Sequence, residues 1–223
     1  MSGRLSGSGR AFAALFDFDM TLMDTSCIIT ECTNLLADKF ALRRVTHAEM
    51  KSLIGLTIED EWIKLWGDFK QEWLDYYRSH FRSIERSGFR EFPDTRSAVE
   101  NLRENGVKTG IVTNRSFARP VAEQCGVSGL FDVIIGRDDV DNPKPHPKPL
   151  LAALSRIGVE TGRAYYVGDT DIDMKTANAA GVIGIGVATG NFTTDELIAA
   201  GASYARGDLT GVADTILEII AHS

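Results

Sequence analysis

The sequence has little of what marks secreted, membrane or disulfide-rich proteins. Its three cysteines, Cys27, Cys32 and Cys125, are too few and too scattered for a disulfide framework or a zinc site, which fits a reducing compartment. No apolar run approaches the roughly 20 residues that span a bilayer. The short apolar stretch before Asp17 does not follow the pattern of a signal peptide. We therefore expect a cytoplasmic protein that does not bind membranes.

Positive charge is outnumbered by negative charge, with 24 Lys and Arg against 31 Asp and Glu. The net charge is -7, which gives the protein no general electrostatic reason to bind nucleic acid or anionic lipid. One local cationic pocket can still bind a small phosphorylated molecule. Hydrophobic residues make up 43% of the 223 residues, enough for a sizeable core. For the oligomeric state we expect a monomer or a homodimer.

Apolar, strand-like runs alternate with helical patterns over most of the chain. This alternation predicts βαβ units, and hence a doubly wound α/β fold with a parallel sheet and helices on both faces. The expected strands are residues 11–16, 107–113, 132–136, 164–167 and 183–189. The expected helices are residues 94–105, 117–125, 148–157, 171–180, 193–200 and 211–221.

Residues 25–89 follow a different pattern, in which apolar side chains recur at helical spacing and no strand intervenes. We interpret them as an all-helical insertion of the core that residues 1–24 and 90–223 form. All three tryptophans, Trp62, Trp66 and Trp73, lie in this insertion, where helix packing is their expected role. Residues 1–10 are rich in Ser and Gly and are expected to form a loose tail.

Two carboxylates, Asp17 and Asp19, follow the first apolar run directly. Carboxylates at the end of a buried strand are costly to desolvate unless something compensates their charge. A divalent cation is the usual compensation, and Mg²⁺ is the ion that commonly accompanies phosphates. An aspartate held in this way can also attack phosphorus and form an aspartyl-phosphate.

Three further segments carry polar residues to the same edge of the predicted sheet. Thr113 and Asn114 follow one strand, Asp169 and Asp173 follow another, and Lys144 lies in a proline-rich loop before a helix. Open α/β sheets bind ligands at the carboxyl ends of their strands. A lysine and a hydroxyl can hold phosphate oxygens there, while one carboxylate attacks and a second transfers protons.

The motifs together resemble those of the haloacid dehalogenase superfamily, in its phosphoglycolate phosphatase-like branch with a helical cap. The four segments that carry the resemblance are Phe16-Asp17-Phe18-Asp19-Met20-Thr21-Leu22, Ile111-Val112-Thr113-Asn114, Lys144-Pro145-His146-Pro147 and Gly168-Asp169-Thr170 with Asp173. The resemblance covers nearly the whole chain. It implies that the helical insertion is a cap that closes over the active site.

The resemblance also implies a role for each residue. Asp17 would be the nucleophile, and Asp19 would be the general acid and base. Asp17, the Asp19 backbone carbonyl and Asp169 would bind Mg²⁺, with Asp173 in support. Thr113, Asn114 and Lys144 would bind the phosphoryl group, and Arg115 could reach a second anionic group. Met20 stands where the family usually has Gly, and Thr21 favours a phosphatase over a sugar phosphate mutase.

The sequence thus predicts a magnesium-dependent phosphatase that hydrolyses a small phosphate monoester, and the resemblance implies phosphoglycolate as the leading candidate. Sugar phosphates, pyrophosphate and nucleoside monophosphates stay open as substrates. A phosphomutase, a phosphonatase with a cap lysine, and a non-catalytic binding protein on the same core are the alternatives.

Overall fold

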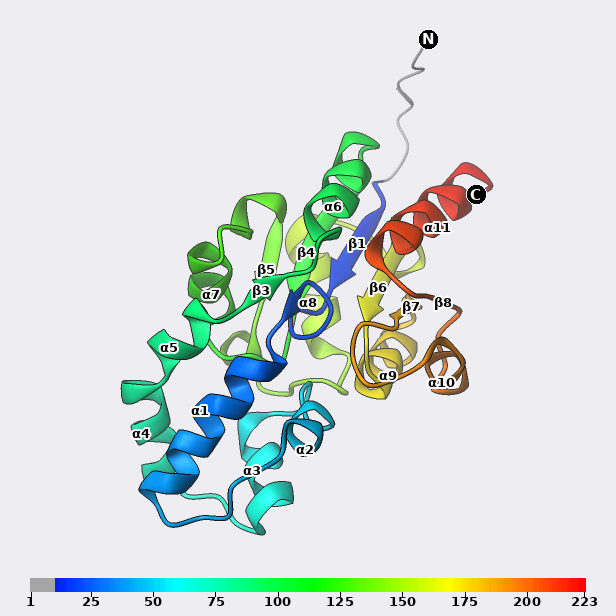
Figure 1. Ribbon diagram of the computed structural model, residues 1–223. Coiled ribbons are helices and arrows are strands. Elements are labelled where there is room, and N and C mark those ends of the chain that lie inside the picture. The colour runs from blue at the N-terminus through cyan, green and yellow to red at the C-terminus, as the bar shows by residue number, and fades with distance from the viewer. Residues whose placement is uncertain (1–10) are drawn as a thin grey trace.

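The computed structural model describes residues 11–223, so the tail expected at residues 1–10 lies outside the described residues. Its centre is a parallel sheet in the order β5-β4-β1-β6-β7-β8 (Figure 1). In chain order the strands are β1 (Ala13–Phe16), β4 (Lys108–Val112), β5 (Val133–Ile135), β6 (Ala164–Gly168), β7 (Ile183–Val187) and β8 (Tyr204–Arg206). The strand order reverses between β1 and β6, because β4 and β5 are added on one side of β1 and β6, β7 and β8 on the other. Such folds bind their ligands at this point.

Both faces of the sheet are buried, which explains why its strands are continuous apolar runs. Along β1, Ala14 and Phe16 join the cluster under one layer of helices, whereas Ala13 and Leu15 join the cluster under the other. Helices α6 (Thr95–Glu104), α7 (Ala118–Gln124) and α11 (Leu209–Ala221) supply the first layer. Helices α8 (Lys148–Ile157) and α9 (Asp171–Ala180) supply the second.

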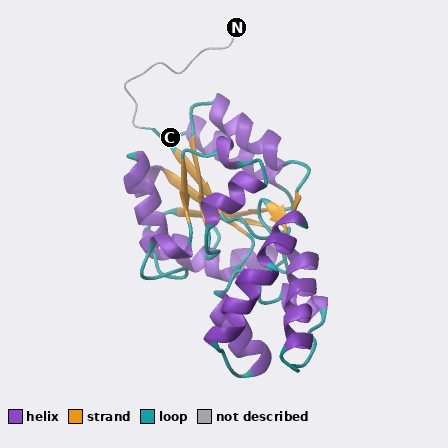
Figure 2. Ribbon diagram, turned by 90° about the vertical axis from the view of Figure 1, so that its left-hand side faces the viewer, coloured by secondary structure: helices purple, strands orange, loops and turns teal. Residues whose placement is uncertain are grey.

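This arrangement confirms the predicted doubly wound α/β core, with helices on both sides of the sheet (Figure 2). The remaining core elements are α10 (Thr194–Ala199) and three short 3₁₀ helices, at Ser128–Leu130, Arg137–Asp139 and Thr161–Arg163. Among the helices of the described chain, none is both long enough and apolar enough to cross a membrane.

Five helices form a separate bundle beyond the carboxyl ends of the strands (Figure 1). They are α1 (Ser26–Lys39), α2 (His47–Lys51), α3 (Ile58–Trp66), α4 (Gln71–His80) and α5 (Arg82–Ser87). Their shared apolar cluster includes Trp62 and Trp73, which are nearly fully buried. The side chains of Thr46 and Thr57 cap α2 and α3, because each accepts a hydrogen bond from a backbone N–H of the first turn.

A small antiparallel pair joins the bundle to the core. Strands β2 (Met23–Asp24) and β3 (Arg90–Glu91) pair with each other where the chain leaves the core and where it returns. The sequence analysis did not predict this pair or strand β8. Each is only two or three residues long, too short for an apolar pattern to form.

Candidate active site

The two motif aspartates lie at the carboxyl end of β1. The Asp17 backbone N–H donates to the Val167 carbonyl at 2.9 Å, which extends the β1–β6 pairing by one residue. The pairing aims the Asp17 side chain into the interior, where it is 1% exposed, and Asp19 is 8% exposed. Both carboxylates are therefore buried at the end of the strand, as the apolar run before them predicted.

Lys144 lies against Asp17 and is itself almost fully buried. Its ammonium is 2.9 Å from Asp17 Oδ1 and 2.7 Å from Asp173 Oδ1. It also donates to the Tyr166 hydroxyl at 2.9 Å. Three oxygens thus surround a group that has three protons to donate. Lysine, which is rarely buried without a partner, is held here by two carboxylates.

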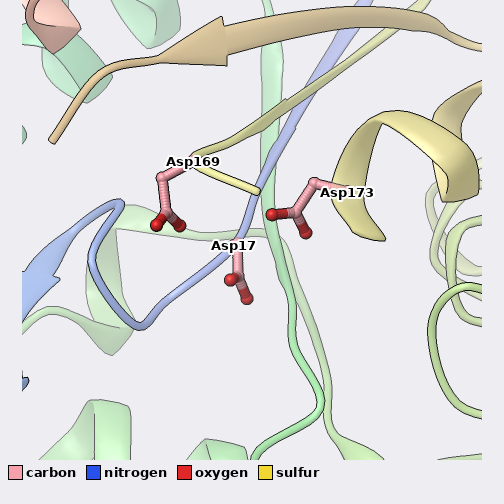
Figure 3. Close-up of side chains that lie close together, drawn as sticks. All are labelled: Asp17, Asp169 and Asp173. Carbon is pink, nitrogen blue, oxygen red and sulfur yellow. The ribbon is translucent and has the colours of Figure 1, made fainter. Parts of the chain in front are cut away.

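Three carboxylates lie close together at this site, as Figure 3 shows. Oxygen atoms of Asp17, Asp169 and Asp173 lie within 4.8 Å of one another. They come from the end of β1, the end of β6 and the first turn of α9. One ammonium balances only one of the three negative charges, and uncompensated buried charge is strongly unfavourable. The cluster is therefore an acidic triad that could bind a metal ion.

The surroundings of Asp169 fit a metal ligand. Its Oδ1 accepts a hydrogen bond from the Thr21 hydroxyl at 3.1 Å, which fixes the orientation of the carboxylate. Its Oδ2 lies beside Gly190, where a β-carbon would come within 1.9 Å of it. Only glycine leaves room for the carboxylate in this position. Aspartate oxygens are the ligand type that Mg²⁺ prefers.

Asp173 has a different environment, because hydrogen bonds occupy both of its oxygens. Oδ1 contacts Lys144 and accepts from Tyr166 at 3.0 Å, while Oδ2 accepts from the Thr170 hydroxyl at 2.6 Å and from its backbone N–H at 3.1 Å. Thr170 and Asp173 form a capping box at the start of α9. These contacts fit a supporting residue that positions Lys144 better than they fit a direct metal ligand.

Burial dominates the electrostatics of the triad in the absence of a metal ion. Desolvation raises the pKa of Asp17 from 3.8 to about 7, against the opposing charge of Lys144. Desolvation and the neighbouring carboxylates also raise the pKa of Asp169 well above its ordinary value. Burial by itself would lower the pKa of Lys144, but Asp17 and Asp173 outweigh it and hold the pKa above its ordinary range. The lysine therefore stays charged.

Tyr166 is a member of this cluster that the sequence analysis missed. It lies in the middle of β6 and is fully buried, so in the sequence it looks like an ordinary strand residue. Its hydroxyl accepts from Lys144 and has the Val112 carbonyl at 2.8 Å and Asp173 Oδ1 at 3.0 Å as acceptors. A tyrosine in a fully buried strand needs a polar partner, and that requirement is the signal that could have identified it.

Thr113 and Asn114 follow β4 and line the cleft above Asp17. The Asn114 side chain connects two distant segments. Its amide nitrogen donates to the Lys144 carbonyl at 3.1 Å and to the Gly55 carbonyl in the helical insertion at 3.0 Å. Its oxygen accepts from the Lys144 backbone N–H at 2.9 Å. Asn114 therefore holds the lysine loop in place and ties it to the insertion.

Arg115 forms a two-point ion pair with Asp19. Its Nε donates to Asp19 Oδ2 at 3.0 Å, and its Nη2 donates to Oδ1 at 2.5 Å. The guanidinium lies over the ring of Phe89, with 4.7 Å between its central carbon and the ring centre. Each carboxylate oxygen of Asp19 accepts one of these hydrogen bonds, so Arg115 fixes the orientation of the carboxylate.

Met20 adopts the backbone conformation that explains why glycine is usual at its position. Its φ is 57°, in the left-handed region where a side chain costs about 1–2 kcal/mol. The side chain is 3% exposed and packs into the apolar cluster of the insertion, beside residues such as Ile29 and Ile54. This packing offsets the backbone strain and fixes the loop that carries both aspartates against the helical bundle.

A cleft opens over Asp17 and Asp19 between the core and the insertion, with about 810 Å³ of space that is partly open to solvent. Thr113, Asn114 and Arg115 line its core side. The insertion supplies the opposite wall, mostly with apolar side chains and with a few charged ones: Ile29, Ile54, Leu56, Ile58, Leu74, Tyr77, Glu59, Glu61 and Arg78. An apolar lining with a few polar and charged side chains is typical of a site for a small molecule.

Comparison with known proteins places this geometry in a family. The haloacid dehalogenase-like hydrolase family matches residues 14–187. "Probable phosphatase IndB" of Dickeya dadantii is 32% identical over 83% of this chain and 85% of its own length. A phosphoglycolate phosphatase of Aquifex aeolicus is 28% identical over 75% of this chain and 80% of its own length.

A solved structure supports the same assignment over the full fold. A haloacid dehalogenase-like hydrolase from Bacteroides fragilis aligns with a TM-score of 0.81 and 30% identity, covering 91% of this chain and all of that one. The family match spans well over half of the chain and includes the segments of Asp17, Thr113, Lys144 and Asp169. The chain is therefore an enzyme of the haloacid dehalogenase-like hydrolase family.

Proposed function

We propose that the protein is a magnesium-dependent phosphatase that hydrolyses a small phosphate monoester through an aspartyl-phosphate on Asp17. The observation that carries this proposal is the Lys144 ammonium, which lies 2.9 Å from Oδ1 of Asp17, a residue that lines the cleft. A carboxylate beside a charged lysine and a second carboxylate, Asp169, is suited to attack a phosphate dianion once a cation reduces the repulsion. Phosphoglycolate is the leading substrate candidate, in line with the phosphatase relatives.

Asp17, Asp169 and the backbone carbonyl of Asp19 would hold the Mg²⁺ ion. When bound, the ion neutralises carboxylate and phosphate charge, so that the anionic nucleophile can approach the phosphorus atom. Thr21 and Gly190 position Asp169 for this role through the hydrogen bond and the close approach described above. Asp173 would act through Lys144.

The proposed reaction has two steps, phosphorylation of Asp17 and hydrolysis of the aspartyl-phosphate. In the first, an Asp17 oxygen bonds to phosphorus, the ester P–O bond breaks, and Asp19 gives its proton to the leaving alkoxide. In the second, Asp19 takes a proton from water, the water oxygen bonds to phosphorus, and the aspartyl P–O bond breaks. Inorganic phosphate leaves, and both aspartates return to their initial states. Thr113 and the Asn114 backbone would hold the phosphoryl oxygens. Lys144, whose three protons face Asp17, Asp173 and Tyr166, would neutralise charge on the nucleophile and the phosphate.

The helical insertion, residues 25–89, is proposed to act as a cap over this reaction. The hydrogen bond from Asn114 to the Gly55 carbonyl supports this role, because it joins the insertion to the phosphoryl-binding loop. Closure would exclude bulk water and select the leaving group. The ion pair with Arg115 would hold the proton-transferring carboxylate of Asp19 at the edge of the cleft.

A phosphate-release assay over a panel of phosphorylated metabolites, with and without Mg²⁺, tests the proposal. Wild-type protein is expected to release phosphate only with the metal, and Asp17→Asn is the matched blank because it removes the nucleophile at constant size. A folded wild-type protein that fails to hydrolyse para-nitrophenyl phosphate would contradict the proposal. Isomerisation of a sugar phosphate without net phosphate release would instead identify a mutase.

A further inference from the structure

The helical insertion carries one positively charged side chain in the cleft, and the proposed reaction does not use it. Arg78 lies on α4, and it lines the cleft together with Leu74 and Tyr77 of the same helix. Residues spaced by three and four positions share one face of a helix, so these three side chains form a single surface directed at the cleft. Asp17 and Asp19 line the opposite side.

Among the side chains that the structure describes, Arg78 has no hydrogen-bond or ion-pair partner. Its side chain is half-buried, and its Nε atom is shielded from solvent without any hydrogen bond. None of the ion pairs between described side chains includes Arg78. A shielded donor that lacks an acceptor destabilises the folded protein. Such a group is retained more readily where a ligand completes its hydrogen bonds.

The other arginines of the cleft are engaged by the protein. Arg115 holds Asp19, and Arg137 donates from Nη1 to the Val140 carbonyl at 3.1 Å. The position of Arg78 in the last turn of α4 favours a cation through the helix dipole, but it does not supply an acceptor for a buried Nε. The helix alone therefore does not account for this side chain.

We propose that Arg78 determines specificity by binding a carboxylate on the leaving group of the substrate. This inference rests on the proposed phosphatase function and assigns the substrate class of the same site. The planar guanidinium presents parallel N–H groups that match the two oxygens of a carboxylate. The apolar wall of Ile54, Leu56 and Leu74 suits a small carbon skeleton between the two charged ends of the substrate.

Two acidic residues of the insertion also line the cleft, and the helix to which they belong accounts for their position. Glu59 and Glu61 lie in the first turn of α3, where the helix dipole favours negative charge. They would disfavour a leaving group that carries more negative charge than Arg78 neutralises. The cleft therefore selects a monocarboxylate over a leaving group with several negative charges.

Matched phosphate esters test this proposal directly. The first set shares a two-carbon alcohol and consists of 2-phosphoglycolate, 2-hydroxyethyl phosphate and phosphoethanolamine, which end in a carboxylate, a hydroxyl and an ammonium. The second pair, 3-phosphoglycerate and glycerol 3-phosphate, extends the alcohol by one carbon. With Mg²⁺, wild-type kcat/KM is expected to be at least about tenfold higher for the carboxylate than for the neutral ester in one of the sets, equivalent to about 1.4 kcal/mol.

The variant Arg78→Gln is expected to lower that ratio about tenfold, mainly through KM, and Arg78→Lys is expected to lie between it and wild type. Arg44→Gln is the matched control, because it removes an exposed arginine that pairs with Asp38 on the insertion, away from the cleft. Wild-type hydrolysis without a carboxylate preference in either set overturns the inference even if Arg78→Gln does not fold. Failure to release phosphate from any ester contradicts the proposed function itself.

Discussion

The Lys144 ammonium lies 2.9 Å from Asp17 Oδ1, and both groups are almost completely buried. This contact joins the end of the first strand to a loop more than a hundred positions later in the chain. A buried lysine needs an anionic partner, and a buried nucleophile needs a nearby cation to remain ionised. Each residue therefore compensates the charge of the other. The surrounding carboxylates carry further negative charge, which a second cation would compensate.

The raised pKa of Asp17 predicts a pH-dependent stability for the metal-free protein. The folded state, with a pKa of about 7, holds a proton at pH values where the unfolded chain, at 3.8, has lost it. The contribution to stability is therefore complete below the unfolded pKa, and it is lost as pH rises through about 7. We expect the free energy of unfolding to fall between pH 5 and pH 8 by at most about 1.4 kcal/mol per pH unit for this proton.

Urea denaturation in the presence of a chelator measures this dependence. Asp17→Asn is the control, because it removes the titrating group and should flatten the slope relative to wild type. Asp169, whose pKa is also raised, is retained in both proteins and so contributes to both slopes. Parallel pH profiles of the two proteins would contradict the assignment of the raised pKa to Asp17.

Asp19→Asn is predicted to separate the two steps of the proposed reaction. With para-nitrophenyl phosphate the leaving group needs no proton, so phosphorylation of Asp17 should continue. Hydrolysis of the phosphoenzyme needs Asp19 as a base, and it should slow by a factor on the order of 100 or more. Stopped-flow absorbance should then show a burst of nitrophenolate that approaches one equivalent per active site. A slow linear release with no burst, by a folded protein, would argue against this role.

Gly190→Ala is predicted to weaken Mg²⁺ binding. The added β-carbon would come within 1.9 Å of Asp169 Oδ2, so the carboxylate has to rotate away from the orientation that Thr21 holds. Changes of this kind around metal ligands typically weaken metal affinity about 10–100-fold. The measurement is the Mg²⁺ concentration that gives half-maximal activity. Gly207→Ala is the control, because an added β-carbon there meets nothing within 4 Å; equal effects of both changes would refute the prediction.

Tyr166→Phe is predicted to lower both stability and catalysis, because Lys144 loses one of its three oxygen partners. An unpaired buried donor costs about 1–3 kcal/mol, which sets the expected fall in the free energy of unfolding. Tyr165→Phe is the matched control, since its side chain faces the opposite apolar cluster and its hydroxyl has no hydrogen bond among the described residues. Urea denaturation of both variants checks this, and indistinguishable stabilities would contradict it.

The sequence predicted the elements whose apolar pattern is long and whose ends carry clear signals. Residues 148–157 and 171–180 were predicted as helices with the bounds that the structure has, and each ends at a left-handed glycine, Gly158 and Gly181. Strand β8 was not predicted, because three partly exposed residues at a sheet edge give no pattern. The local sequence pattern was therefore enough to predict buried elements with clear end signals. It was not enough to predict a short strand at the sheet edge.

The residues of the candidate site also differ in whether the sequence alone could indicate them. Asp17, Asp19 and Asp169 could be proposed from the sequence, because an acidic residue directly after a buried apolar strand is costly to desolvate unless it has a function. Tyr166 and Arg78 could not be proposed from the sequence, because each is common in its local element. Tyr166 lies in a buried strand, and Arg78 lies in the last turn of a helix. Only the tertiary structure reveals that one completes the lysine environment and that the other faces the cleft without a partner.

The central claim is that Asp17 carries the phosphoryl group, and reductive trapping tests it most directly. Asp19→Asn protein is mixed with para-nitrophenyl phosphate and Mg²⁺, quenched, and treated with borohydride, which reduces an aspartyl-phosphate to homoserine. Peptide mass spectrometry is predicted to find homoserine at position 17. Homoserine at another aspartate, or an unmodified Asp17 in protein that shows a full nitrophenolate burst, would contradict the account.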